Sequence, residues 1–210
     1  MSKLVFDTVK GVIAARLAVP VAWVRYTQAE VDAINRALLG DLAEAHKGMK
    51  VSQKGVDLIH GFEQLRLNAY PDPGSRNGLP ITCGWGTTVD EDGGPIPRDA
   101  VWTKEKADRL FARDLAKFET GVNLLLGGAP TTQNQFDALV SFAYNVGLDI
   151  DNDAVAEGLG DSTLLKRHRA GEYANAQRAF HSWVFNDGKR LRGLERRRQA
   201  EADLYGSSQP

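Results

Sequence analysis

Helical periodicity runs through most of this 210-residue chain and is interrupted by one stretch of turn and strand character. Apolar residues at helical spacing predict helices at about 103–126, 132–145, 162–170, 172–183 and 190–203, and a further helix that begins after Ser52. Ahead of the long helix 103–126, Tyr70–Gly78 is rich in turn residues, and Ile81–Val89 mixes β-branched and aromatic residues with glycine, as in a short twisted hairpin. This order predicts a mostly helical α+β fold with two lobes, in which the long helix joins a small β-hairpin lobe to a helical lobe.

The first 48 residues are predicted to form a separate unit. An amphipathic helix is expected over residues 4–18, and the capping box Thr27-Gln-Ala-Glu30 opens a second helix that ends near Gly48. Together these helices are too short to bury a core of their own. We therefore expect residues 1–48 to be an arm that packs on the main domain, residues 49–210, or on a partner.

The apolar residues near the N-terminus are not continuous. Charged residues and a proline interrupt them, namely Asp7, Lys10, Arg16 and Pro20, whereas a membrane span needs about 20 mostly apolar residues. The charges also spoil the apolar region that a signal peptide requires. We expect a soluble protein that is made in the host cytoplasm and acts elsewhere only after release, with binding to a membrane surface as the alternative.

Composition excludes several classes of protein. Lys plus Arg number 26 against 27 Asp plus Glu, a net charge of −1, so a dedicated nucleic-acid binder is not expected. The single cysteine, Cys83, cannot form an internal disulfide, and the four scattered histidines form no zinc motif. Asp149-Ile-Asp-Asn-Asp153 begins like a calcium loop, but Ala154 and Gly160 stand where that loop needs Gly and Glu. We therefore expect a monomer without metal or cofactor.

Three residues around the predicted hairpin could carry chemistry. Glu63 falls at the end of the helix after Ser52, Asp72 falls in the loop that enters the hairpin, and Thr82 opens the returning strand. Two carboxylates that face each other across such a junction suit glycoside hydrolysis, in which one donates a proton and the other stays ionised. Burial sets that division, because it favours the protonated form of a carboxyl group. The alternative is that both are ordinary solvated surface residues.

One motif identifies a known family. The run Gly61-Phe-Glu-Gln-Leu-Arg-Leu-Asn-Ala-Tyr-Pro-Asp72, followed by Thr82-Cys-Gly-Trp-Gly-Thr-Thr88, closely resembles the catalytic signature of the phage-type lysozymes (endolysins, glycoside hydrolase family 24). The similarity continues through Gln135–Gly147 and Gly193–Leu204, so it covers about residues 50–206. The chain departs from the pattern in having nine residues between Asp72 and Thr82, more than the family's shortest form, and Thr87 where a histidine is common.

The resemblance implies a lysozyme-like fold and hydrolysis of the β-1,4 bond between N-acetylmuramic acid and N-acetylglucosamine in peptidoglycan. Glu63 would then be the general acid, Asp72 would position the attacking water or stabilise the transition state, and Thr82 would orient that water. The family also suggests inversion at the anomeric carbon. The site of action would be the cell wall or periplasm.

Four further residues are candidates for binding the substrate. By resemblance Asn145 faces the cleft, and Arg196 approaches Glu63 from the last helix, with a plain surface arginine as the alternative. Trp85 and Tyr144 could line the cleft, although aromatic residues of this kind more often belong to the core. The basic run Lys189–Arg198 could form a surface that attracts an anionic polymer, or merely an exposed helix face.

Two rival functions stay open at this point. A lytic transglycosylase would use Glu63 alone and release 1,6-anhydro sugars, and the presence of Asp72 at the family spacing disfavours it. A non-catalytic peptidoglycan-binding relative would keep the fold without the activity. The products of digestion separate the first rival from a hydrolase, and the effect of Glu63→Gln separates the second.

Overall fold

The computed structural model describes residues 48–71, 77–150, 157–186 and 188–207. The predicted N-terminal helices and the candidate Asp72 therefore lie outside the described residues. The elements occur in the order α3 (Gln53–Phe62), β1 (Arg66–Pro71), β2 (Ile81–Gly84), α4 (Lys104–Leu126), α5 (Gln133–Val146), α6 (Thr163–Arg169), α7 (Tyr173–Ala179), the 3₁₀ helix η2 (Phe180–Ser182), β3 (Phe185–Asn186), β4 (Lys189–Arg190) and α8 (Arg192–Gly206).

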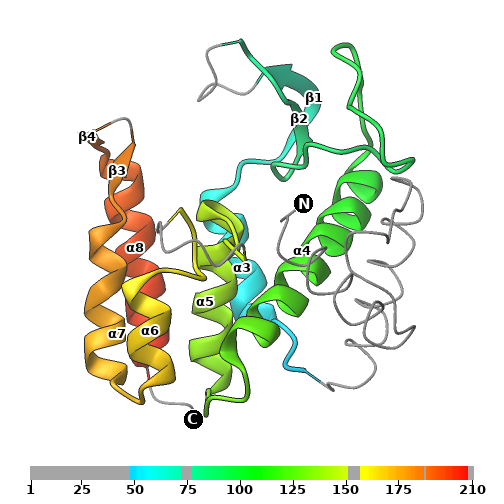
Figure 1. Cartoon of the computed structure of the whole chain (residues 1–210). Helices are drawn as coiled ribbons and strands as arrows, with labels where there is room; N and C mark the ends of the chain where they lie inside the picture. The colour runs from blue at the N-terminus through cyan, green and yellow to red at the C-terminus, as the bar shows by residue number, and fades with distance from the viewer. Residues whose placement is uncertain (1–47, 72–76, 151–156, 187, 208–210) are drawn as a thin grey trace, which may run out of the picture.

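Helix α5 is the centre of the helical lobe, with α3, α4 and α8 packed around it (Figure 1). It begins with a capping box between Thr132 and Gln135, and residues 134–143 are buried on every side of the helix. Phe142 meets the rings of Phe180 and Trp183 edge-on, at centroid separations of 5.5 and 5.3 Å. The helical lobe is thus built around a helix that has no solvent-facing side over most of its length.

The β-lobe has a small core of its own. Strands β1 and β2 pair antiparallel, with Tyr70 opposite Thr82. The core of this lobe consists of six buried residues, two of them on β2: Ile81, Cys83, Ile96, Trp102, Ala107 and Leu110. The last two belong to the first turns of α4, whereas Val122 and Leu126 near its other end join the core of the helical lobe. Helix α4 therefore belongs to both lobes and joins them (Figure 1), as the sequence predicts.

Strand pairing differs from the prediction in two places. The strand opposite Ile81–Gly84 is Arg66–Pro71, so it takes in residues 70 and 71 that the sequence suggests are turn. The hairpin predicted within Ile81–Val89 is reduced to a single bridge between Cys83 and Thr87. A second short hairpin, β3–β4, precedes α8 and was not predicted. The pairing of β1 with β2 joins separated segments, which local periodicity does not report. Strands β3 and β4 are local, but with two residues each they are too short to show an alternating pattern.

The predicted helices are present with shifted ends. The region 172–183 divides into α7 and the 3₁₀ helix η2, and α8 begins at Arg192 and ends at Gly206. Among the residues that the structure describes, no helix combines the length and the apolar character needed to cross a membrane.

Candidate active site

Glu63 stands at the point where α3 ends. Its backbone is extended (φ −95°, ψ 121°) while its N–H still donates to the carbonyl of Ile59, so the chain leaves the helix here towards β1. The carboxyl group is 23% exposed. The structure thus places Glu63 at a helix end, as predicted, and leaves part of its side chain open to solvent.

The carboxyl of Glu63 is held by an arginine from α8. Arg197 Nη1 donates to Glu63 Oε1 at 2.6 Å, and its guanidinium also lies 5.6 Å from the centre of the Phe62 ring. The prediction that Arg196 approaches Glu63 is wrong, because Arg196 is exposed. Successive residues on a helix point about 100° apart, so only one of two neighbouring arginines can face α3.

Arg197 belongs to a buried ion network. Its Nε donates to Glu201 Oε1 at 3.1 Å, and Arg198 Nε lies 2.7 Å from Glu201 Oε2. The Ser141 hydroxyl of α5 donates to the same Glu201 Oε1 at 2.9 Å. Burial raises the pKa of the Glu201 carboxyl, and the two guanidinium groups oppose that rise by stabilising its charge.

The network bears on the prediction that the basic run Lys189–Arg198 forms an exposed, positively charged surface. Arg197 and Arg198 are buried, so they are not part of an exposed basic surface. Arg190 is exposed and is paired with Glu195. The predicted basic surface is therefore smaller than the sequence suggests.

Asn145, at the exposed end of α5, accepts a hydrogen bond from Arg198 Nη2 at 3.0 Å. Its side chain is thus accessible and oriented by the same network. This position is compatible with the predicted contact to a substrate.

The other oxygen of Glu63 faces the β-lobe. A Cβ atom placed on Gly86 would come within 3.5 Å of Glu63 Oε2, and Gly86 has φ +93°, a conformation that favours glycine. Within the described residues, Oε2 accepts no hydrogen bond. The carboxyl therefore lies between α8 on one side and the turn after β2 on the other, with one oxygen engaged.

Thr82 and Asp72 are the other two predicted catalytic residues. Thr82 lies on β2, is 7% exposed and stands opposite Tyr70 in the ladder. Asp72 lies outside the described residues and follows directly after Pro71, the last residue of β1. The separation of the two predicted carboxylates therefore stays a prediction.

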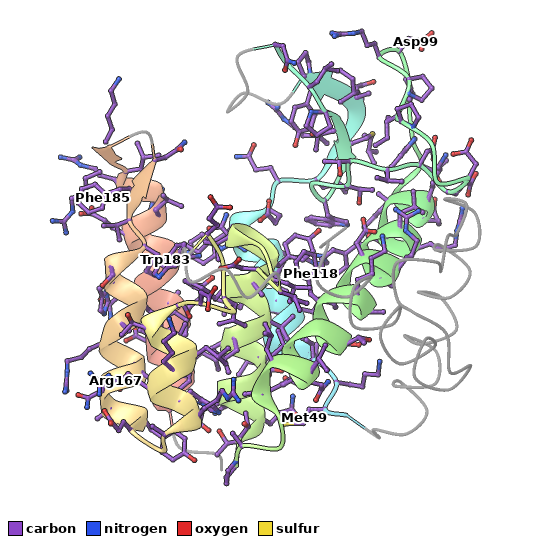
Figure 2. All side chains as sticks on the ribbon, viewed as in Figure 1. Met49, Asp99, Phe118, Arg167, Trp183 and Phe185 are labelled. Atoms are coloured by element: carbon purple, nitrogen blue, oxygen red, sulfur yellow. The ribbon has the colours of Figure 1, made fainter. Side chains whose placement is uncertain are left out.

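Trp85 and Tyr144 connect the lobes. The Trp85 indole donates to Asp108 Oδ1 at 2.8 Å, and the Tyr144 hydroxyl donates to the Trp85 carbonyl at 3.0 Å. The Tyr144 ring also packs against Phe118, which lies where α4 faces α5 (Figure 2). Burial raises the pKa of the Tyr144 hydroxyl, so it remains a hydrogen-bond donor. Both residues thus have a structural role beside the predicted contact with substrate.

His60 lies directly under Trp85. The two rings stack at a centroid distance of 3.8 Å and an interplanar angle of 12°. Burial lowers the pKa of His60, which keeps the ring neutral for this contact. In the described ranges, no group of three or more His, Cys, Asp or Glu is placed to hold a metal ion.

The sequence reasoning missed Arg197 and Glu201 as parts of the site. Their spacing gave a signal, because residues four apart on a helix share a face and Glu201 is also three residues after Arg198. The signal was weak, because pairs at this spacing also occur on exposed helix faces.

The fold and this site place the chain in a known class. The family model described as phage lysozyme matches residues 60–201, and the chain belongs to that family. An endolysin of Bacillus phage B103 is 39% identical over 157 residues, which cover 75% of this chain and 54% of the relative. An endolysin of Acyrthosiphon pisum secondary endosymbiont phage 1 is 35% identical, and the match covers 76% of this chain and all of the relative. The chain spans little more than half the length of the Bacillus phage endolysins.

Solved structures agree with this assignment. An endolysin from Escherichia coli O157:H7 phage FAHEc1 matches with a TM-score of 0.63 and 39% identity, covering 75% of this chain and 94% of that one. The muramidase domain of SpmX from Asticaccaulis excentricus matches with a TM-score of 0.62 and 35% identity, covering 76% and 99%. These likenesses support the two-lobed, mostly helical architecture derived above.

Proposed function

We propose that this chain is an endolysin-type muramidase that hydrolyses the β-1,4 bond between N-acetylmuramic acid and N-acetylglucosamine in peptidoglycan. The observation that carries the proposal is the placement of Glu63, a partly exposed carboxyl with Oε1 bound to Arg197 and Oε2 directed at the β-lobe. The names of its relatives, endolysins and a muramidase domain, support the same chemistry. The chain acts on the wall as a monomer.

The catalytic roles follow from this placement. Oε2 of Glu63 is the oxygen that donates a proton to the leaving sugar, because Oε1 is already occupied by Arg197. A glycan over the site covers the part of this carboxyl that is open to water. Asp72 activates the attacking water and Thr82 orients it, which gives inversion at the anomeric carbon.

The direct test compares the parent protein with Glu63→Gln and Asp72→Asn on purified peptidoglycan, with release of reducing ends as the readout. Glu63→Gln should lower the rate at least about a hundredfold, the usual scale of a lost general acid. Glu91→Gln, an exposed glutamate paired with Arg109, is the matched control and should keep the parent rate. No release by either the parent or Glu63→Gln would indicate a non-catalytic wall-binding protein, and equal release by both would contradict the role given to Glu63.

The products decide between the remaining mechanisms. Mass spectrometry should find reducing muramic acid ends, whereas 1,6-anhydro ends would indicate a lytic transglycosylase. Proton NMR of the first-formed anomer should show the α configuration, which is inversion of a β bond. An initial β anomer would contradict the role given to Asp72.

Residues 49–210 form the catalytic domain in this proposal, and residues 1–48 are accessory. Within the described residues, the start of the domain is fixed at Met49, whose backbone exchanges two hydrogen bonds with the Asn123 side chain, each of 2.9 Å. A truncation that begins at Met49 should therefore lyse purified walls like the parent. Loss of lysis by a folded truncation would overturn this division.

A further inference from the structure

Glu201 is the only anion that the described part of α8 brings into contact with Arg197, and it is fully buried. Its Oε1 accepts from Ser141 Oγ, Arg197 Nε and Arg198 Nη2, at 2.9, 3.1 and 3.0 Å. This carboxylate is therefore the common partner of two buried guanidinium groups. Burying a carboxylate costs free energy of folding unless the charge is paired, so Glu201 depends on these two arginines.

The charges of the buried part of this network do not balance by themselves. Arginine stays protonated in proteins, so Arg197 and Arg198 contribute two positive charges against the single negative charge of Glu201. The remaining positive charge faces Glu63, whose Oε1 lies 2.6 Å from Arg197 Nη1 and can accept its hydrogen bond whether or not Oε2 carries a proton. Arg197 is thus shared between a buried carboxylate and the proposed general acid.

The position of the Arg197 guanidinium is fixed from two sides. Nε is bound to Glu201 of α8, and Nη2 donates to the carbonyl of Ser141 on α5 at 3.2 Å. These contacts leave Nη1 to meet Glu63. The titratable groups that act on Glu63 from the packed elements are His60 of α3, Tyr144 of α5 and Arg197 of α8.

We propose that Glu201 is a positioning residue of the active site. It holds the Arg197 guanidinium so that one N–H reaches Glu63, and its own negative charge offsets part of the positive charge that Arg197 presents to the Glu63 carboxyl. The effect on turnover rests on the proposed function of Glu63. The electrostatic coupling between Glu201 and Glu63 does not, since it follows from the shared guanidinium alone.

The test replaces Glu201 by Gln in the full chain. Without the Glu201 charge, Arg197 acts on Glu63 alone and holds its carboxylate form to lower pH. The Glu63 side-chain carboxyl, followed by carbon-13 NMR, should titrate at least about half a pH unit lower than in the parent. The alkaline limb of the kcat/KM profile should move by the same amount, and kcat should fall about tenfold with KM nearly unchanged.

The matched control is Asp137→Asn. Asp137 is also fully buried on α5, but its oxygens bind Ser52 and Gln133 near the start of α3, away from Glu63 at its end. This variant should lose stability and keep the titration of Glu63 and the alkaline limb. An identical displacement in the two variants, or none in Glu201→Gln, overturns the proposal.

Glu201→Asp decides the matter if Glu201→Gln does not fold. This variant keeps the negative charge but moves the carboxylate oxygens one methylene group away from Arg197. Glu63 should therefore titrate as in the parent, while kcat falls about fivefold or more at unchanged KM. A parent-like kcat in this variant overturns the positioning role. If the folded parent releases no sugar, the proposed function fails, and the NMR titration still decides whether Glu201 is coupled to Glu63.

Discussion

Two buried polar clusters lie along α8, and they are built in different ways. The first consists of the charged residues Arg197, Arg198 and Glu201, of which Arg197 contacts Glu63. The second, one helical turn further on, joins Tyr205 to His168, whose exposed fraction is zero. A charged cluster costs free energy when it is buried, whereas a neutral hydrogen-bonded chain adds to stability.

The neutral cluster forms a directed chain of hydrogen bonds. The Thr131 hydroxyl donates to the carbonyl of Ala129 at 2.8 Å, so it accepts from His168 Nε2, at 2.8 Å. His168 Nδ1 then accepts from the Tyr205 hydroxyl, at 2.6 Å. Burial lowers the pKa of His168 to about 4, so the ring is uncharged at neutral pH. The comparison shows that α8 buries charged side chains next to the candidate active site. One turn further on, where it only packs against neighbouring helices, its buried polar groups are uncharged.

Removing the anion of the charged cluster should have the largest effect. Glu201→Leu leaves two buried guanidinium groups without their shared partner, and we expect the free energy of unfolding to fall by about 3–5 kcal/mol. Urea unfolding monitored by circular dichroism measures this loss. A loss below about 1 kcal/mol would show that the two clusters do not differ in the way described.

Acid should weaken the neutral cluster. The pKa of His168 is about 4 in the folded protein against 6.5 as its ordinary value, so the unfolded chain takes up the proton first. The contribution of His168 is therefore complete above pH 6.5 and is lost as the pH falls towards 4, by about 3 kcal/mol at most. His168→Gln keeps a donor and an acceptor but does not titrate. The difference in unfolding free energy between the two proteins should shrink over this range, and a constant difference would refute the linkage.

Tyr205→Phe should have a smaller effect on the same cluster. The substitution leaves the ring packing against Phe180 in place and removes the hydroxyl that satisfies His168 Nδ1. We expect a loss of about 1–2 kcal/mol, the cost of one unsatisfied buried acceptor. Thermal unfolding gives the value, and hydrolysis of peptidoglycan should not change because the cluster does not touch Glu63.

Arg196→Gln should have the smallest effect. Its side chain is exposed, so the free energy of unfolding should stay within about 0.5 kcal/mol of the parent. Arg197→Gln, one position further, removes the partner of both Glu63 and Glu201 and should lose several times as much. Similar losses at the two positions would contradict the orientation of α8.

Local signals were enough to predict much of this fold. The long helix was expected at 103–126 and spans Lys104–Leu126, because an N-capping threonine and apolar periodicity act within a few residues of sequence. Glu63 was placed at a helix end for the same reason. Strand β1 was not predicted, although its first four residues alternate between exposed and half-buried, because it is short and its pairing partner lies in another segment.

The charged cluster could not be predicted from local sequence signals. Arg196, Arg197 and Arg198 are identical in type and adjacent in sequence, so only the rotation of α8 against α3 and α5 decides which of them is exposed. Contacts between elements far apart in sequence, such as that of Tyr205 with Phe180, help to set that rotation. The role of Asp72 stays a prediction from the motif.

The bond between Glu63 and Arg197 joins residues 134 positions apart in the chain. During translation, the residues of α3, the β-lobe and the long helix α4 are synthesised well before residue 197 is added. During that interval the nascent polypeptide already carries Glu63 but lacks the guanidinium that orients it. The contact that orients Glu63 can therefore form only after α8 has been synthesised.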